Sequence, residues 1–124
     1  MKTFIFGEFK NCCFSVGHYN KENAMGITIV DADTEEDIET LTILDKDYDY
    51  EIGVVTIYND NVVGNEVEGY KTGTQILQDL GIVEKIWTTY DLDVDGINSI
   101  PISICSINLN LLKDYSRDWN YWGG

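Results

Sequence analysis

The strongest constraint on the fold is a succession of short β-branched and aromatic runs separated by turn residues. Glu39–Leu44 and Ile100–Ile107 alternate apolar and polar residues with the period of two that marks a half-buried strand. Other runs have the length and composition of strands without strict alternation. The predicted strands are Thr3–Phe6, Cys12–Tyr19, Gly26–Val30, Glu39–Leu44, Ile52–Tyr58 and Ile100–Ile107.

One segment has the spacing of an amphipathic helix. Thr74 is placed to cap its N-terminus, and Ile76, Leu77 and Leu80 would form its apolar face. Gly81 follows at the position where a helix ends in the left-handed conformation. This pattern predicts a helix from Thr74 to Leu80.

The remaining segments complete an α+β picture. Ile82–Tyr90 is ambiguous but favours a strand, and Asn108–Trp122 indicates a short amphipathic helix or a packed extension. Pro101 confines its run to a strand start or a sheet edge. We therefore expect a single α+β domain over residues 1–124, an antiparallel sheet of about five to seven strands with one main helix packed on one face.

Composition limits the classes of function. The chain has 44 % apolar residues, enough for a core without disulfides or metals, and a formal net charge of −14. Such a field repels nucleic acid and anionic membranes, and it favours basic protein surfaces or cations. No signal peptide and no apolar run long enough to span a bilayer is evident. The sequence predicts a cytoplasmic protein that binds neither nucleic acid nor membrane directly.

The nucleophilic side chains do not form a recognisable catalytic motif. Cys12 and Cys13 are adjacent, Cys105 lies in another apolar run, and His18 is the only histidine. Adjacent strand residues point to opposite faces, which argues against a zinc site that uses both cysteines. We expect reduced, buried thiols, no enzyme activity and no cofactor.

The most distinctive chemical feature is the acidic stretch from Asp31 to Glu51. Two sets of acids alternate, and in an extended chain residues i and i+2 point the same way about 6.6–6.8 Å apart, close to the phosphate spacing of a nucleic-acid strand. Tyrosines interleave with the second set and could supply interface contact area. A solvated edge that resists aggregation is the competing interpretation. The predicted partner-binding residues are Asp31, Asp33, Glu35, Glu36, Asp37, Asp45, Asp47, Tyr48, Asp49, Tyr50 and Glu51.

A second acidic segment matches part of a calcium loop. Asp91, Asp93, Asp95 and Gly96 have the spacing of the first half of that loop, but Ile102 stands where the bidentate glutamate belongs. The sequence thus offers Asp91, Asp93 and Asp95 only as a weak metal candidate, and an acidic turn is favoured.

The order of these elements resembles a family of small domains of unknown function found in phages and mobile elements of Gram-positive and gut bacteria. The resemblance rests on Met1–Phe6, Gly17–Tyr19, the hairpin from Gly26 to Leu44, Ile76–Ile82 and Ile102–Ile107. It implies a mobile-element origin. By analogy, small acidic proteins in that setting are often anti-defence factors, such as anti-CRISPR proteins and DNA mimics.

These observations together predict a phage-type anti-defence protein, an anti-CRISPR acting in the host cytoplasm. Its partner would be a nucleic-acid-binding defence protein such as a CRISPR effector, blocked by the acidic surface. The alternatives are a sponge for a nucleotide immune messenger and a calcium-dependent interaction module. The sequence leaves the oligomeric state open.

Overall fold

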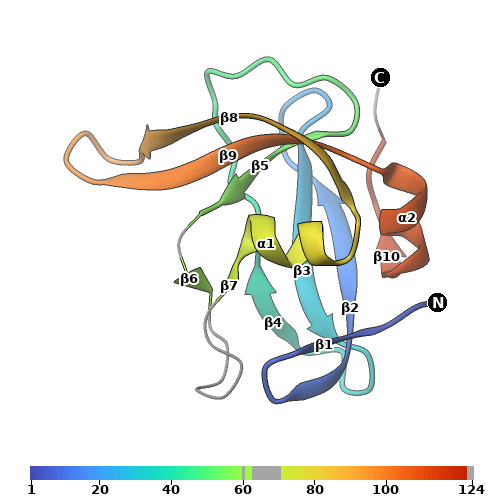
Figure 1. Cartoon of the computed structure of the whole chain (residues 1–124). Helices are drawn as coiled ribbons and strands as arrows, with labels where there is room; N and C mark the ends of the chain where they lie inside the picture. The colour runs from blue at the N-terminus through green and yellow to red at the C-terminus, as the bar shows by residue number, and fades with distance from the viewer. Residues whose placement is uncertain (60, 63–70, 123–124) are drawn as a thin grey trace.

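The computed structural model describes residues 1–59, 61–62 and 71–122, and it is mainly antiparallel β-sheet with two short helices (Figure 1). The elements are β1 (Phe4–Phe6), β2 (Phe9–His18), β3 (Met25–Asp31), β4 (Asp37–Thr40), β5 (Val54–Tyr58), β6 (Asn61–Val62), β7 (Lys71–Thr72), α1 (Gly73–Asp79), β8 (Val83–Asp93), β9 (Ser99–Ile107), α2 (Leu109–Asp114) and β10 (Ser116–Trp119).

The first sheet is organised around β2. Its strand order is β1-β2-β3-β4, with β10 parallel to β2 and every other pairing antiparallel. β1 pairs with the first part of β2, from Phe9 to Cys12, and β10 pairs with Phe14 to Val16. β1 and β10 therefore pair with successive parts of β2, so the strands at both ends of the described chain pair with the same strand.

The second sheet has the order β5-β9-β8, and β8 forms its outer edge. β8 and β9 make a long hairpin that extends beyond the end of β5, because β5 stops at the pair Tyr58–Ile102 while β8 continues to pair as far as Asp93–Ser99. Figure 1 shows this hairpin projecting from the body of the molecule. Pro101 lies in the part of β9 beyond β5, where its missing N–H removes no bond to that strand.

The main core lies where the two sheets cross. In Figure 1 the strands of the second sheet run across those of the first, with α1 drawn in front of the first sheet and α2 at the right. Fully buried side chains from both sheets fill the space, among them Phe14, Ile27 and Ile29 from the first and Val55 and Ile57 from the second. A smaller cluster under residues 43–48 contains Val54, Ile102 and Ile104.

The helices differ from the expectation of one main helix. α1 has seven residues and α2 has six, so neither dominates. Thr72 caps α1 instead of Thr74, because the Thr72 hydroxyl and the Gln75 side chain form a reciprocal capping box. The Thr74 hydroxyl instead donates to the Asn59 side-chain oxygen at 2.7 Å. The predicted C-terminus is confirmed, with Gly81 at a φ of +77°.

Most predicted strands are confirmed, with one informative error. The expected strand Glu39–Leu44 ends at Thr40, after which Leu41 and Thr42 hydrogen bond to Ile27 of β3 while Thr42 forms a bridge with Ile57 of β5. The ambiguous segment after Gly81 is the long strand β8, and the C-terminal segment contains both a short helix and a packed strand. No helix within the described residues is long and apolar enough to cross a membrane.

Gly73 provides a test of this packing. A Cβ built on Gly73 would lie 2.9 Å from the Ile57 Cγ2 and 3.3 Å from the Tyr58 carbonyl oxygen, whereas one on Gly17 meets nothing within 4 Å. We expect Gly73→Ala to lower the free energy of unfolding by about 1–3 kcal/mol in urea denaturation, because the close approach of α1 to β5 leaves no room. Gly17→Ala is the matched control and should leave stability unchanged or raised; equal effects of the two variants would contradict this packing.

Candidate binding site

The first acidic set, Asp31 to Glu36, is folded into the turn between β3 and β4. The Asp31 carboxylate accepts the backbone N–H groups of Asp33 at 2.8 Å and Thr34 at 3.2 Å, which is an Asx turn. The N–H of Glu35 donates to the Asp31 carbonyl at 2.9 Å. The predicted extended row of carboxylates is wrong here, because a turn points successive side chains in different directions.

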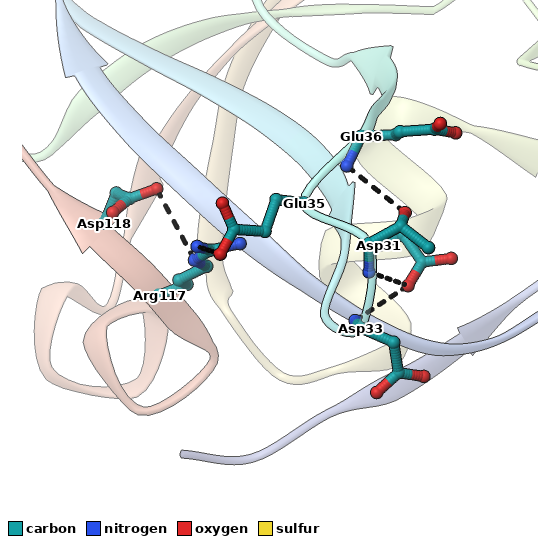
Figure 2. A network of polar contacts seen from close by, with 7 residues as sticks. Asp31, Asp33, Glu35, Glu36, Arg117 and Asp118 are labelled. Carbon is teal, nitrogen blue, oxygen red and sulfur yellow. Dashed lines mark hydrogen bonds and ion pairs between the residues drawn. The ribbon is translucent and has the colours of Figure 1, made fainter.

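The only arginine of the chain neutralises part of this turn. Glu35, at a φ of +71°, forms an ion pair with Arg117 of β10, and Asp118 lies on the other side of the same guanidinium (Figure 2). Asp33 accepts a hydrogen bond from the Asn11 amide at 3.1 Å. Glu36 and Asp37 are exposed. Several acids of the first set therefore brace the turn and its contact with β10.

The second acidic set, Asp45 to Glu51, lies in a loop rather than in a strand. Asp45 is only 9 % exposed, and its carboxylate accepts the backbone N–H of Asp47 at 3.0 Å and the hydroxyl of Tyr90 from β8. The N–H of Tyr48 closes the turn on the Asp45 carbonyl at 3.2 Å. Asp45 is therefore an internal tie between this loop and the second sheet, while Asp47, Asp49 and Glu51 are exposed.

The two tyrosines of this loop have structural contacts. Tyr50 is 7 % exposed, and its hydroxyl accepts the N–H of Asp45 at 3.0 Å and lies 2.6 Å from the Thr56 hydroxyl. The partly buried Tyr48 packs edge-on against Tyr50 and against the smaller core cluster. Tyr50 therefore shapes the loop from inside and has little surface to offer a partner.

The two acidic sets lie far apart in space. In Figure 1 the turn between β3 and β4 is at one end of the first sheet, and the loop before β5 passes over the other end. The predicted single surface from Asp31 to Glu51 is therefore divided into two separate acidic regions.

The structure instead joins the second acidic set to the segment that resembled half a calcium loop. Loop residues 43–47 and the end of β8 enclose a cavity of about 350 Å³, which we call the acidic groove. Its apolar lining comes from both segments, and carboxylates and one lysine complete it. The lining residues are Ile43, Leu44, Asp45, Lys46, Asp47, Leu92, Asp93 and Val94.

The carboxylates of the hairpin tip brace that tip. Asp93 accepts the N–H groups of Asp95 and Gly96, at 3.2 and 2.6 Å. Asp95 accepts the N–H groups of Ile97 and Asn98, and the bonds from the Asn98 backbone, the Asn98 amide and the Ile97 backbone lower its pKa. Within residues 1–59, 61–62 and 71–122, no group of three or more His, Cys, Asp or Glu side chains is arranged to hold a metal ion.

The thiols and the histidine lie apart from the groove. Cys12, Cys13 and Cys105 are free and buried, as predicted, and burial raises the pKa of Cys12 and of Cys105 to about 11. Protonated thiols are poor nucleophiles at neutral pH. The His18 ring is stacked on Trp122 with centroids 4.4 Å apart, and its Nε2 lies 3.2 Å from the Lys21 carbonyl oxygen.

Sequence reasoning missed Tyr90, Leu92 and Val94 as site residues. Their signal was present, since apolar and acidic residues alternate from Tyr90 to Asp95 as they do in a strand with one partly buried face. Their contact with loop 43–47 could not be predicted from the sequence, because more than forty residues separate the two segments.

Comparisons with known proteins add no assignment. No protein-family model, curated protein or solved structure matches this chain. The resemblance to small phage and mobile-element domains therefore stays a prediction.

The first prediction from this site concerns the Tyr50 hydroxyl. Tyr50→Phe leaves the Asp45 N–H and the Thr56 hydroxyl without this partner, so we expect the free energy of unfolding to fall by about 1–3 kcal/mol. Tyr48→Phe is the matched control, since it removes the hydroxyl of a neighbouring, partly exposed tyrosine, and it should change stability by less than about 0.5 kcal/mol. Equal losses in urea denaturation would contradict the role of Tyr50.

The second prediction is a loss of stability at alkaline pH. Burial raises the pKa of Cys12, Cys105, Tyr50 and Tyr90 above the ordinary values of 9.0 for thiols and 10.0 for phenols. The unfolded chain therefore loses these protons before the folded chain does, so stability is complete below pH 9 and falls as the pH rises through 9 and 10.

Urea denaturation between about pH 8 and pH 10.5 measures this effect, with each fully coupled group contributing at most about 1.36 kcal/mol per pH unit. Tyr90→Phe, which removes one of the shifted phenols, should flatten the decline. A free energy of unfolding that is constant over this range would refute the prediction.

Proposed function

We propose that this protein is a binding protein that occupies a basic, nucleic-acid-binding surface of another protein through the acidic groove and the exposed acids beside it. The observation that carries the proposal is the meeting of loop 43–47 with the end of β8 around a cavity that both apolar and acidic side chains line. Such a cavity suits a lysine or arginine side chain, whose stem packs on apolar groups while its cation meets a carboxylate.

The charge distribution supports this choice of partner. The chain carries 22 acidic and 8 basic residues, and Lys46 is the only cation among the residues that line the groove. Exposed Asp47, Asp49 and Glu51 extend the negative surface along the same loop. A surface of one sign steers an oppositely charged partner, which makes association fast and sensitive to salt.

The biological setting follows from the predicted resemblance. In a phage or mobile element, a small acidic protein that blocks a nucleic-acid site would act as an anti-defence protein, and an anti-CRISPR that inhibits a CRISPR effector is the version we favour. The mechanism differs from the phosphate-spaced rows expected from the sequence, because the first acidic set forms a turn and the second lies in a loop. In this mechanism the acidic surface and the groove compete with nucleic acid for the basic channel of the partner. They do not reproduce the regular spacing of phosphates.

A messenger sponge is the alternative. A nucleotide messenger needs cations for its phosphates. Two further cavities lined by described residues, each of about 350–360 Å³, contain no lysine or arginine; His18 lines one of them and Asp91 the other. These linings favour the protein-binding function over the sponge.

The test uses variants at the two separated acidic ends. Asp47→Asn/Asp49→Asn/Glu51→Gln removes three exposed charges beside the groove. Glu36→Gln/Asp37→Asn/Glu39→Gln removes two exposed charges and one partly buried charge at the opposite end. Asp45 stays unchanged because it is internal. The protein and both variants are titrated into purified CRISPR effector complexes, and DNA binding by each complex is followed by fluorescence anisotropy.

We expect stoichiometric loss of DNA binding with the parent protein, weakened at high salt. The groove-side triple variant should lose at least about tenfold in potency, and the opposite-end variant should keep it. Loss confined to the opposite-end variant would contradict the groove as the interface. The sponge would be favoured by two results together. The parent protein would have no effect on any complex, and after incubation with messengers it would release nucleotide when denatured.

A further inference from the structure

β8 has a free edge. It is the last strand of the sheet β5-β9-β8, and no strand in the described part of the chain pairs with its outer side. Its side chains are largely exposed, including Trp87 at 56 %. Alternate backbone N–H and C=O groups of an edge strand point outward and can bind another extended chain.

The two halves of this edge differ. In the first half, the register with β9 shifts between Val83 and Lys85 and again between Ile86 and Thr88. The Lys85 ammonium also lies 3.8 Å from the Trp87 ring centroid. Irregularities and charges of this kind protect an edge from pairing. From Thr88 to Asp93 the register is continuous, so this half keeps the regular geometry that a new strand requires.

Cavities flank the regular half. Because successive strand side chains point to opposite faces, Thr89 and Asp91 lie on the face opposite Tyr90 and Leu92. Leu92 lines the acidic groove with Asp47. Thr89 and Asp91 line a second cavity of about 360 Å³, and Asn59, Tyr90, Pro101 and Ile102 complete its lining. An added strand would send its alternate side chains towards these two cavities, the arrangement that gives specificity in strand addition.

Charge selects the occupant of this edge. Asp91 is exposed beside the second cavity, and Asp47 is exposed beside the groove. A second copy of the chain would bring its own Asp91 and Asp93 to the edge and would add a net charge of −14. Like charges placed opposite each other destabilise strand pairing, whereas lysine or arginine would complement both cavities.

We propose that Thr88–Asp93 is a docking edge for an extended basic segment of the partner protein, which joins the second sheet as an additional strand. Neighbouring Lys or Arg side chains of that segment then reach Asp91 on one face and Asp47 on the other. This inference rests on the proposed function and specifies how the basic partner is held.

The probe is the peptide acetyl-Thr-Val-Lys-Arg-Val-Thr-amide, added to the full-length protein. Two further versions carry N-methyl groups on one or the other alternate set of peptide nitrogens, and a fourth replaces Lys-Arg by Glu-Glu. Affinity is measured by calorimetric titration, and amide hydrogen exchange is followed by NMR at Thr88–Asp93. Asp91→Asn is compared with Glu84→Gln, which removes a charge from the irregular half of the same strand.

Strand addition predicts slower exchange at Thr88–Asp93 and at least a tenfold loss of affinity for one N-methylated version but not the other. It also predicts no binding of the Glu-Glu peptide, and weaker binding to Asp91→Asn but not to Glu84→Gln. Equal affinity of both N-methylated versions and the parent peptide, unchanged exchange, or absence of binding would overturn the docking edge. Slower exchange at Thr88–Asp93 on raising the protein concentration alone would assign the edge to a second copy and overturn it too.

The two proposals can fail separately. If the groove-side triple variant loses inhibition while N-methylation has no effect, the acidic surface binds a partner without strand addition. If the peptide adds to β8 but the protein never displaces DNA from an effector, the docking edge stands and the blocking function is wrong.

Discussion

The structure depends on a short junction, Leu41 to Ile43, that hydrogen bonds to both sheets. The Leu41 N–H donates to the Ile27 carbonyl of β3 at 2.9 Å, and the Leu41 carbonyl accepts the Tyr58 N–H of β5 at 3.0 Å. The buried Thr42 hydroxyl accepts the Ile27 N–H at 3.0 Å. This junction fixes the crossing of the two sheets. Its backbone is hydrogen-bonded to β3 on one side and to β5 on the other, so any other arrangement would lose buried hydrogen bonds.

The acidic groove is a consequence of this junction. Once the chain has crossed at Thr42, residues 43–51 must pass over the second sheet, where Tyr50 and Asp45 attach the loop to Thr56 and Tyr90. The loop therefore closes one side of the groove and β8 closes the other. Buried contacts hold a binding surface of this kind in place. Its exposed carboxylates are therefore positioned before a partner binds, which reduces the entropy lost on binding.

Much of the secondary structure was predictable because it is encoded locally. Period-two alternation identified Ile100–Ile107, and Gly81 marked a helix end that the backbone confirms. The error at Glu39–Leu44 has a physical cause. The alternation of apolar and polar residues continues through Thr42, but the chain pairs with β3 up to Thr40 and with β5 at Thr42. The helix cap was predicted at Thr74, but the Thr74 hydroxyl is bound to Asn59, and the Thr72 hydroxyl accepts the Gln75 N–H in its place.

By itself, the sequence determined the strand-rich composition, the buried thiols and the strongly negative charge, because each depends on residue type and short-range pattern. The structure decided which acids are bound internally and which face a groove. Asp31, Asp93 and Asp95 brace turns, Asp45 is buried against Tyr90, and Asp47 faces a groove shared with Leu92. A carboxylate's role depends on the donors that reach it. Asp31, Asp93 and Asp95 accept from N–H groups two or three residues away, whereas the hydroxyl that reaches Asp45 comes from the distant strand β8.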